Sequence, residues 1–229
     1  MKTNSLFKNL FAGAFIAVIA TGLVSCKKDD IDETGSANVK VVNASRTSSP
    51  QGFYLADKTV VQGGLSFGNA SDGYIVANSG NNLTLQFRND GSSTAYASTN
   101  TNLDKGKYYT VFLAGDGQSA RIKVFADDMA APSSGKAKVR FVHLSDAAPA
   151  NVDIRTDATT NIAANLARDN ASGYVEVNPG FSSLQVYPAG GTTSAGTFNL
   201  TAFASGKIYT VYVTGSTAND ITVRQVSHN

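Results

Sequence analysis

The chain has 229 residues, with 19 Lys and Arg residues against 17 Asp and Glu residues, and only 16% of its residues are charged. One cysteine, two histidines and no tryptophan exclude a disulfide scaffold, a thiolate zinc site and a haem-attachment motif. The nearly balanced charge indicates no basic surface, so we expect no nucleic-acid partner, and the abundance of Gly, Ser, Thr, Asn and Ala is typical of an extracellular β protein.

The N-terminus has the features of a secretory signal. Two lysines and no acidic residue occupy residues 1–10, and a nearly unbroken apolar stretch follows from Phe11 to Val24. This stretch is too short to span a bilayer comfortably. It ends in L-V-S-C at residues 23–26, which resembles the bacterial lipoprotein box, and Cys26 is the only cysteine in the chain. We therefore expect residues 1–25 to be a cleaved lipoprotein signal peptide and Cys26 to be lipidated, in preference to a buried core cysteine.

Acyl chains such as palmitate on Cys26 would anchor the protein on a membrane without spanning it. Residues 26–36 then comprise the lipidated cysteine and a polar stretch without periodicity, for which we expect a flexible tether. Its Lys- and Asp-rich start resembles the export signal of surface lipoproteins in Bacteroidetes, although plain solvation of a linker explains it equally well. The expected location is the bacterial outer membrane, at the cell surface or on its periplasmic face.

The rest of the chain is a tandem repeat with an offset of one hundred residues. Residues 37–45 align with 137–145, and residues 106–115 align with 206–215. Two further blocks, beginning at Gly73 and Asn78, keep the same offset. We therefore expect a first repeat over residues 37–128, a linker over 129–136 and a second repeat over 137–229.

Each repeat shows the pattern of a β-sandwich. Apolar residues alternate with polar ones, as at Leu83, Leu85 and Phe87, and turn residues recur every 8 to 12 positions. Asp-Gly pairs at residues 90–91 and 116–117 favour hairpin turns. No convincing amphipathic helix is present. The sequence predicts an all-β protein of two homologous Ig-like, Greek-key sandwiches.

Two tyrosines are expected to be structural. Leu103, Gly106 and Tyr109 have the same spacing as Phe203, Gly206 and Tyr209 before the penultimate strand of each repeat. This spacing resembles the tyrosine corner of Greek-key sandwiches, in which the tyrosine hydroxyl bonds to the backbone upstream.

The outer face of the same strands carries unusually large apolar side chains. Alternation places Tyr108 and Phe112 outward in the first repeat and Ile208 and Tyr212 outward in the second. A solvated sheet face is normally polar, so these four residues are expected either to contact the partner domain or to bind a ligand.

The start of the second repeat resembles a bacterial domain-of-unknown-function family, secreted or lipid-anchored and often in tandem. Residues 139–145 read V-R-F-V-H-L-S, against the family signature V-R-V-V-H-A-S-P-D-A-P-x-V-D-V. The departures are Asp146 where proline is expected and Asn43 in place of histidine in the first repeat. A site built on the signature His and Asp could therefore survive only in the second repeat, and the resemblance implies no known chemistry.

No residue pattern indicates catalysis, a metal or a cofactor. His143 is expected to be hydrogen-bonded at a sheet edge, and His228 is expected to fray as the penultimate residue. The pair at residues 127–128 is expected to be a solvated domain end. Asp153 and Asp157 are weak candidates for calcium, because no calcium-loop pattern surrounds them.

Two functions remain from the sequence. The first is a non-enzymatic, surface-exposed envelope lipoprotein that binds a glycan or protein ligand, for example in adhesion. The second is a structural spacer or accessory subunit of an envelope assembly. A cryptic hydrolase is a distant third.

Overall fold

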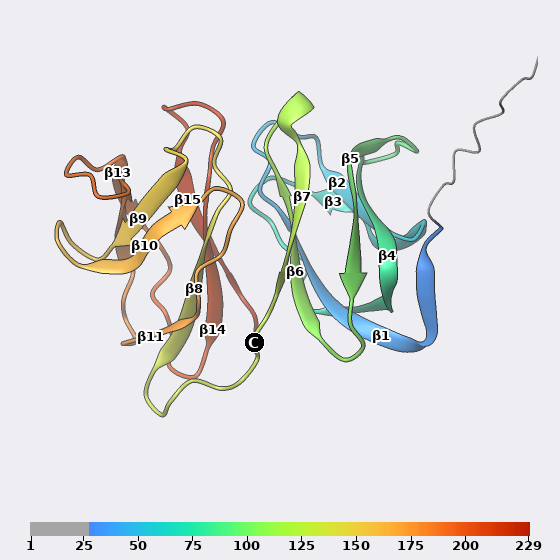
Figure 1. The fold of residues 1–229 in the computed structure, drawn as a ribbon, viewed down its shortest axis with the longest axis horizontal. Coiled ribbons are helices and arrows are strands. Elements are labelled where there is room, and N and C mark those ends of the chain that lie inside the picture. Colours follow the sequence, from blue (N-terminus) through green and yellow to red (C-terminus); the bar gives the residue numbers. More distant parts are fainter. Residues whose placement is uncertain (1–27) are drawn as a thin grey trace, which may run out of the picture.

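The computed structural model describes residues 28–229, which are almost entirely β-structure (Figure 1). The first repeat contains β1 (Asp30–Asn43), β2 (Gln51–Leu55), β3 (Lys58–Leu65), β4 (Ile75–Asn89), β5 (Ala95–Leu103), β6 (Tyr108–Ala114) and β7 (Arg121–Ala126). The second contains β8 (Ala137–His143), β9 (Asn151–Arg155), β10 (Asn161–Ala167), β11 (Val175–Val177), β12 (Ser183–Pro188), β13 (Gly196–Asn199), β14 (Ile208–Thr214) and β15 (Thr222–Ser227). A short 3-10 turn, η1 (Gly117–Ser119), joins β6 to β7. None of the helical structure within residues 28–229 is long and apolar enough to cross a bilayer.

The predicted signal peptide at residues 1–25 and the lipidation site at Cys26 lie outside the described residues.

The first repeat is one seven-stranded sheet that folds into two layers. The turn between the layers is carried by β4, whose first half pairs with β1 and whose second half pairs with β2 and β5. β1 runs parallel to β6, and β7 is the edge strand of this layer. Buried apolar side chains fill the space between the layers. The all-β sandwich predicted from the sequence is confirmed.

The second repeat has the same strand order, divided into two four-stranded sheets. β11 and β12 together take the place of β4, and Pro179 and Gly180 lie between them, where the first repeat has Ser79 and Gly80 inside a continuous strand. Proline has no backbone N–H to donate to a neighbouring strand, so a proline at this position interrupts the ladder. β8 again runs parallel to β14.

Alternation along the first strand of each repeat separates two environments. Val39 and Val41 face the core of the first repeat, while Val42 belongs to a different cluster, between the repeats. Val139 and Val142 divide in the same way in the second repeat. The outward face is therefore buried as well, by the other repeat.

The two predicted tyrosine corners have the expected contact. The hydroxyl of Tyr109 accepts a hydrogen bond from the backbone N–H of Asp104 at 3.0 Å, and that of Tyr209 accepts one from Ala204 at 3.1 Å. Each bond ties the start of the penultimate strand to the turn before it.

The expected tether over residues 26–36 is shorter than predicted. β1 begins at Asp30, and Asp30 and Ile31 pair with Asn81 and Gly80 of β4. Gly80 permits this approach, since a Cβ there would lie 2.1 Å from the carbonyl oxygen of Asp30. Ile31 also packs on the first core. Because this segment is polar, the alternation of apolar residues does not reveal its backbone pairing with β4.

Candidate functional site

The two repeats pack through the outer faces of the β1–β6–β7 and β8–β14–β15 layers (Figure 1). The buried apolar cluster between them comprises Val42, Ala44, Phe112, Ala114, Val142, Leu144, Tyr212 and Val226. The rings of Phe112 and Tyr212 are 5.2 Å apart, and both side chains are fully buried. Because equivalent residues of the two repeats meet, the contact has approximate two-fold symmetry, as in an isologous dimer.

The four predicted outer-face residues therefore do not form an exposed binding surface. Phe112 and Tyr212 contact each other, and Ile208 is buried. Tyr108 is half-buried, and its ring packs edge-on against Tyr74 at 4.9 Å. Phe112 and Tyr212 are contacts between repeats and are not accessible to a ligand.

Asp127 and His228 occupy equivalent positions at the ends of the two edge strands. The backbone N–H of Asp127 donates to Tyr108, and that of His228 donates to Ile208. Their side chains bond to the threonines at equivalent positions, Asp127 to Thr110 and His228 to Thr210, each at 2.7 Å. One repeat thus places a carboxylate where the other places an imidazole.

These groups belong to a closed ring of hydrogen bonds across the junction. Tyr74 donates to Asp127 at 2.6 Å and lies 2.7 Å from Nδ1 of His228. Arg140 donates to Thr210 at 2.9 Å and also to Asp127, with which it forms a buried ion pair. Since Tyr74 donates to the carboxylate, Nδ1 of His228 carries the proton and Nε2 accepts from Thr210.

Two predictions from the sequence are therefore wrong. Asp127 is not part of a solvated domain end, because its side chain is fully buried beside Arg140. His228 does not fray, because the ring of hydrogen bonds holds it in the junction. Asp128 does reach solvent, and it pairs with Lys138 at 2.7 Å.

Lys40 is the counterpart of Arg140 but lacks its anionic partner. Only 6% of Lys40 is exposed, and its ammonium lies 5.9 Å from the centre of the Tyr74 ring. No hydrogen bond or ion pair within residues 28–229 involves the Lys40 ammonium, whose nitrogen keeps contact with solvent. Burial lowers the pKa of Lys40, and the charges of Asp127 and Asp72 oppose this effect.

His228, the equivalent of Asp127 in the second repeat, supplies no negative charge. Burial lowers the pKa of His228 to about 4, and the charge of Lys40 contributes to the lowering, whereas Asp127 opposes it. The imidazole is consequently neutral at neutral pH. The position that supplies a carboxylate to Arg140 is therefore occupied, in the equivalent place of the other repeat, by an uncharged imidazole.

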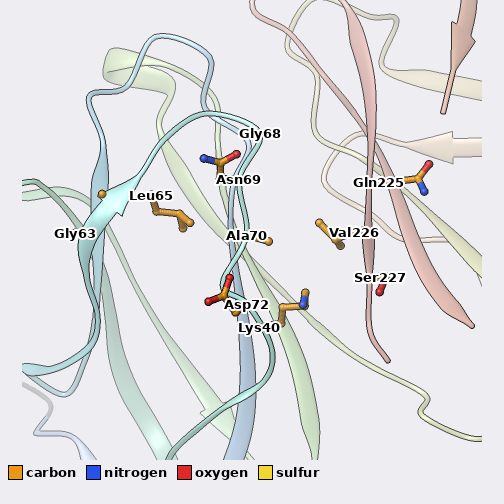
Figure 2. A pocket seen from close by; sticks show the side chains of 11 residues that line it. Lys40, Gly63, Leu65, Gly68, Asn69, Ala70, Asp72, Gln225, Val226 and Ser227 are labelled. Atoms are coloured by element: carbon orange, nitrogen blue, oxygen red, sulfur yellow. The ribbon is translucent and has the colours of Figure 1, made fainter. Parts of the chain in front are cut away.

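The Lys40 ammonium reaches a groove of about 640 Å³ between the repeats (Figure 2). One wall comes from β1, the end of β3 and the loop after β3 in the first repeat, and the other comes from β15 in the second repeat. The lining residues are Lys40, Gly63, Gly64, Leu65, Gly68, Asn69, Ala70, Asp72, Gln225, Val226 and Ser227. We call this space the Lys40 groove. In Figure 2 the Lys40 side chain extends from β1 towards Val226 and Ser227.

The rim of the Lys40 groove carries a second cation. Gly68 has φ of +81°, and a Cβ there would lie 2.6 Å from the guanidinium carbon of Arg224. Glycine is therefore required both for the backbone conformation and for the approach of Arg224. The guanidinium of Arg224 lies 4.6 Å from the centre of the Phe67 ring.

A second groove lies on the other side of the junction. It is formed by β10, the loop that follows it and the first residue of β11 in the second repeat, together with Phe125. Arg140 does not line it, because its guanidinium is held by Asp127 and Thr210 and lies beneath Phe125 and Tyr174. The two grooves therefore differ in the state of their basic residue.

His143 does not lie at a sheet edge as predicted. β8 is flanked by β11 and β14, and His143 is fully buried. Its Nε2 lies 2.8 Å from the carbonyl oxygen of Pro149. Asn43, its counterpart, donates to the carbonyl oxygen of Leu65 at 2.9 Å. His143 thus links the end of β8 to the loop that follows it, whereas Asn43 links the end of β1 to the end of β3.

Asp153 and Asp157 are occupied by other contacts. Asp153 forms an ion pair with Arg155 at 2.9 Å, and Asp157 accepts hydrogen bonds from the backbone of Thr159 and Thr160. Residues 28–229 contain no group of three or more His, Cys, Asp or Glu side chains that could hold a metal ion.

A family model described as Domain of unknown function (DUF4397) matches residues 37–155, more than half of the chain. The chain belongs to this family. The DUF4397 match covers the first repeat and the start of the second, up to the end of β9. The domain-of-unknown-function family predicted from the sequence is thus confirmed. No curated protein matches the chain.

Two solved structures share a distant likeness with this DUF4397 chain. One is CBMbc, of family CBM26, from Eubacterium rectale Amy13K in complex with maltoheptaose; it is 13% identical, with a TM-score of 0.26, over 82% of this chain and 95% of that chain. The other, titled alpha-glucan binding by a streptococcal virulence factor, is 13% identical, with a TM-score of 0.25, over 82% and 96%. Likeness at this level is no basis for transferring a ligand.

Sequence reasoning missed the Lys40 groove, although one signal for it exists. Lys40 and Arg140 occupy the same position in the two repeats, next to core valines. A basic residue retained at an outward position of both copies indicates a shared contact. The difference between their partners appears only when the repeats are packed together.

Proposed function

We propose that this protein is a non-enzymatic cell-envelope lipoprotein that binds a glycan or protein ligand in the Lys40 groove. The observation that carries the proposal is a polar groove with walls from both repeats, lined by a largely buried lysine whose ammonium has no hydrogen bond or ion pair within residues 28–229. A site that needs both repeats also gives the tandem arrangement a purpose. Small-molecule and polymer sites are commonly concave and lie at domain junctions.

The lipoprotein box supports a location at the bacterial outer membrane. Cys26 is the only cysteine, and four residue steps separate it from the first residue of β1. Four fully extended residues reach at most roughly 14 Å. A lipid on Cys26 would therefore hold the sandwich against the membrane, with little freedom to move away from it. We propose the cell surface as the side, with the periplasmic face as the alternative.

The surroundings of the histidines support a binding role over catalysis. His143 and His228 are buried, and each has both ring nitrogens within bonding distance of a protein group. A general base must reach the proton that it removes. Neither histidine meets this requirement in the described structure.

Binding can be tested with a glycan array and with pull-downs from envelope extracts, using full-length protein in detergent. Asn69→Trp fills the Lys40 groove, and Asn170→Trp makes the equivalent change in the second groove; both residues are exposed. We expect Asn69→Trp to abolish a signal that Asn170→Trp retains. Equal loss in both variants, or in neither, would reject the Lys40 groove as the binding site.

The second candidate, a structural spacer or accessory subunit, is favoured by one observation. The continuous buried cluster between the repeats holds them in a fixed orientation, as a spacer requires. Recovery of a defined envelope complex that Asn69→Trp leaves intact, with no glycan signal, would support this function over ligand binding.

A further inference from the structure

From the charges at the junction we infer that the Lys40 groove takes an acidic saccharide and that Lys40 contacts its carboxylate. This inference rests on the proposed binding function and specifies the ligand. It starts from the comparison of two equivalent cations. Arg140 is paired with Asp127, whereas the position equivalent to Asp127 on the other repeat, opposite Lys40 in the repeat comparison, is the neutral His228.

A largely buried cation that makes no direct contact with an anion is unfavourable, because it has lost part of its water and gains only the weaker, more distant charges of Asp127 and Asp72. Only 6% of the Lys40 surface is exposed, and Lys40 nevertheless lines the groove. A carboxylate placed in the groove would supply the counter-charge that Asp127 supplies to Arg140. A bound carboxylate would therefore gain a direct contact with the Lys40 ammonium that no group of the protein makes.

The neighbouring charges leave the groove with an excess of positive charge. The carboxylate of Asp127 is already engaged in an ion pair with Arg140 and in hydrogen bonds from Tyr74 and Thr110. Asp72 is the acidic residue in the lining, and it is exposed. Arg224, at the rim, has no carboxylate within 4 Å in the described part of the chain. Lys40 in the lining and Arg224 beside Gly68 thus contribute two positive charges to this region, and Asp72 contributes one negative charge.

The lining also favours a saccharide over a peptide. Asn69, Asp72 and Ser227 offer donors and acceptors suited to sugar hydroxyls. The two large apolar residues of the lining, Leu65 and Val226, are buried and present no open pocket for an apolar side chain. A ligand rich in hydroxyl groups that also carries a carboxylate fits this surface.

The test uses full-length protein in detergent and an oligomer of galacturonic acid, with its methyl ester as the uncharged control. Calorimetry should show that the acid binds at least about tenfold more tightly than the ester, as expected when a hydrogen bond between charged groups is lost. Lys40→Met should remove this preference, whereas Lys105→Met, at an exposed loop lysine, should leave it unchanged. Asp72→Asn should strengthen binding of the acid and leave binding of the ester unchanged.

Thermal unfolding separates this role from a structural one. Lys40→Met should keep or raise the melting temperature, because it removes an unpaired charge, whereas Arg140→Met should lower it. If Lys40→Met is destabilised as strongly as Arg140→Met, Lys40 is a structural partner and the inference is wrong.

The outcomes also distinguish this inference from the function on which it rests. The acid and the ester could bind equally, with binding abolished by Asn69→Trp and unchanged by Lys40→Met. The groove would then remain a binding site, and the role inferred for Lys40 would be wrong. Peptide binding in the groove, with both saccharides inactive, would overturn the ligand class. If no ligand is found whose binding is abolished by Asn69→Trp, both proposals are wrong.

Discussion

Arg140 of the second repeat and Asp127 at the end of the first form an ion pair in which the side chains are only 3% and 0% exposed. Arg140 also donates to the carbonyl oxygen of Ala126 at 2.7 Å. The guanidinium thus binds both the backbone and the side chain of the other repeat. This contact links the two halves of the chain through buried polar groups.

Breaking this pair should destabilise the protein strongly. Asp127→Asn leaves the Arg140 guanidinium buried without a counter-charge, a change that typically costs about 3–5 kcal/mol. Chemical denaturation would measure the loss. The neighbouring substitution Asp128→Asn is the control, because the Asp128 side chain is 57% exposed and its ion pair is worth about 1 kcal/mol or less. Similar losses for the two variants would contradict the assignment.

Three tyrosine hydroxyls should respond differently to removal. Tyr109→Phe and Tyr209→Phe should each cost about 1 kcal/mol, because each hydroxyl accepts a backbone hydrogen bond. The buried hydroxyl of Tyr212 has no partner in the described structure, so Tyr212→Phe should be neutral or stabilising. Denaturation midpoints of the three variants provide the comparison. Unchanged midpoints for both Tyr109→Phe and Tyr209→Phe would contradict the tyrosine-corner assignment.

The aromatic contact between the repeats should contribute to global stability. Phe112→Ala removes a fully buried ring that packs on Tyr212 and should cost about 3–5 kcal/mol. Val76→Ala provides the control, since Val76 is 69% exposed. A stable Phe112→Ala variant would show that the junction between the repeats adds little to folding.

Stability should fall as the pH is lowered from about 6.5 to about 4. The unfolded chain protonates His228 near its ordinary pKa of 6.5, whereas burial lowers the folded pKa to about 4. The unfolded state therefore binds a proton that the folded state does not, and the folded state loses roughly 3 kcal/mol at most across this window. Burial also lowers the pKa of His143, which adds a loss of the same sign.

The variant His228→Gln tests the assignment, because stability should then depend less steeply on pH between 6.5 and 4. An unchanged slope would show that another group causes the loss. Protonation of His228 at Nε2 would also displace the hydrogen bond from Thr210, so the effect should include loosening of the junction.

The predicted anchor can be tested independently of the fold. Cys26→Ala removes the only residue that can be lipidated in the lipoprotein box, so the variant should leave the detergent phase or remain unprocessed. Phase partitioning and the mass of the mature chain report the result. Unchanged membrane partitioning with normal signal cleavage would make the anchor assignment wrong.

The sequence was informative where a pattern depends on neighbours within one repeat. Alternation indicated that Leu83, Leu85 and Phe87 share one buried face, and the spacing before Tyr109 and Tyr209 indicated their backbone contacts. Both signals arise because a strand has two faces and a turn has a fixed geometry.

The sequence was misleading where burial comes from the other repeat. Asp127 and His228 look like solvated or fraying ends, and nothing in their local sequence shows that a second sheet covers them. The same reason hides the unpaired state of Lys40. Asp30 and Ile31 were misjudged because a polar edge segment can extend a strand through backbone bonds alone.

The two-fold character of the junction has an evolutionary consequence. In a dimer of identical chains, one codon sets both copies of each position, so an aspartate and a histidine could not occupy the places of Asp127 and His228. Joining the halves in a single gene removes that constraint. The Arg140–Asp127 ion pair could then arise on one side of the junction and stabilise the contact between the repeats. On the other side Lys40 remained without a direct partner, so it could be selected for a different function.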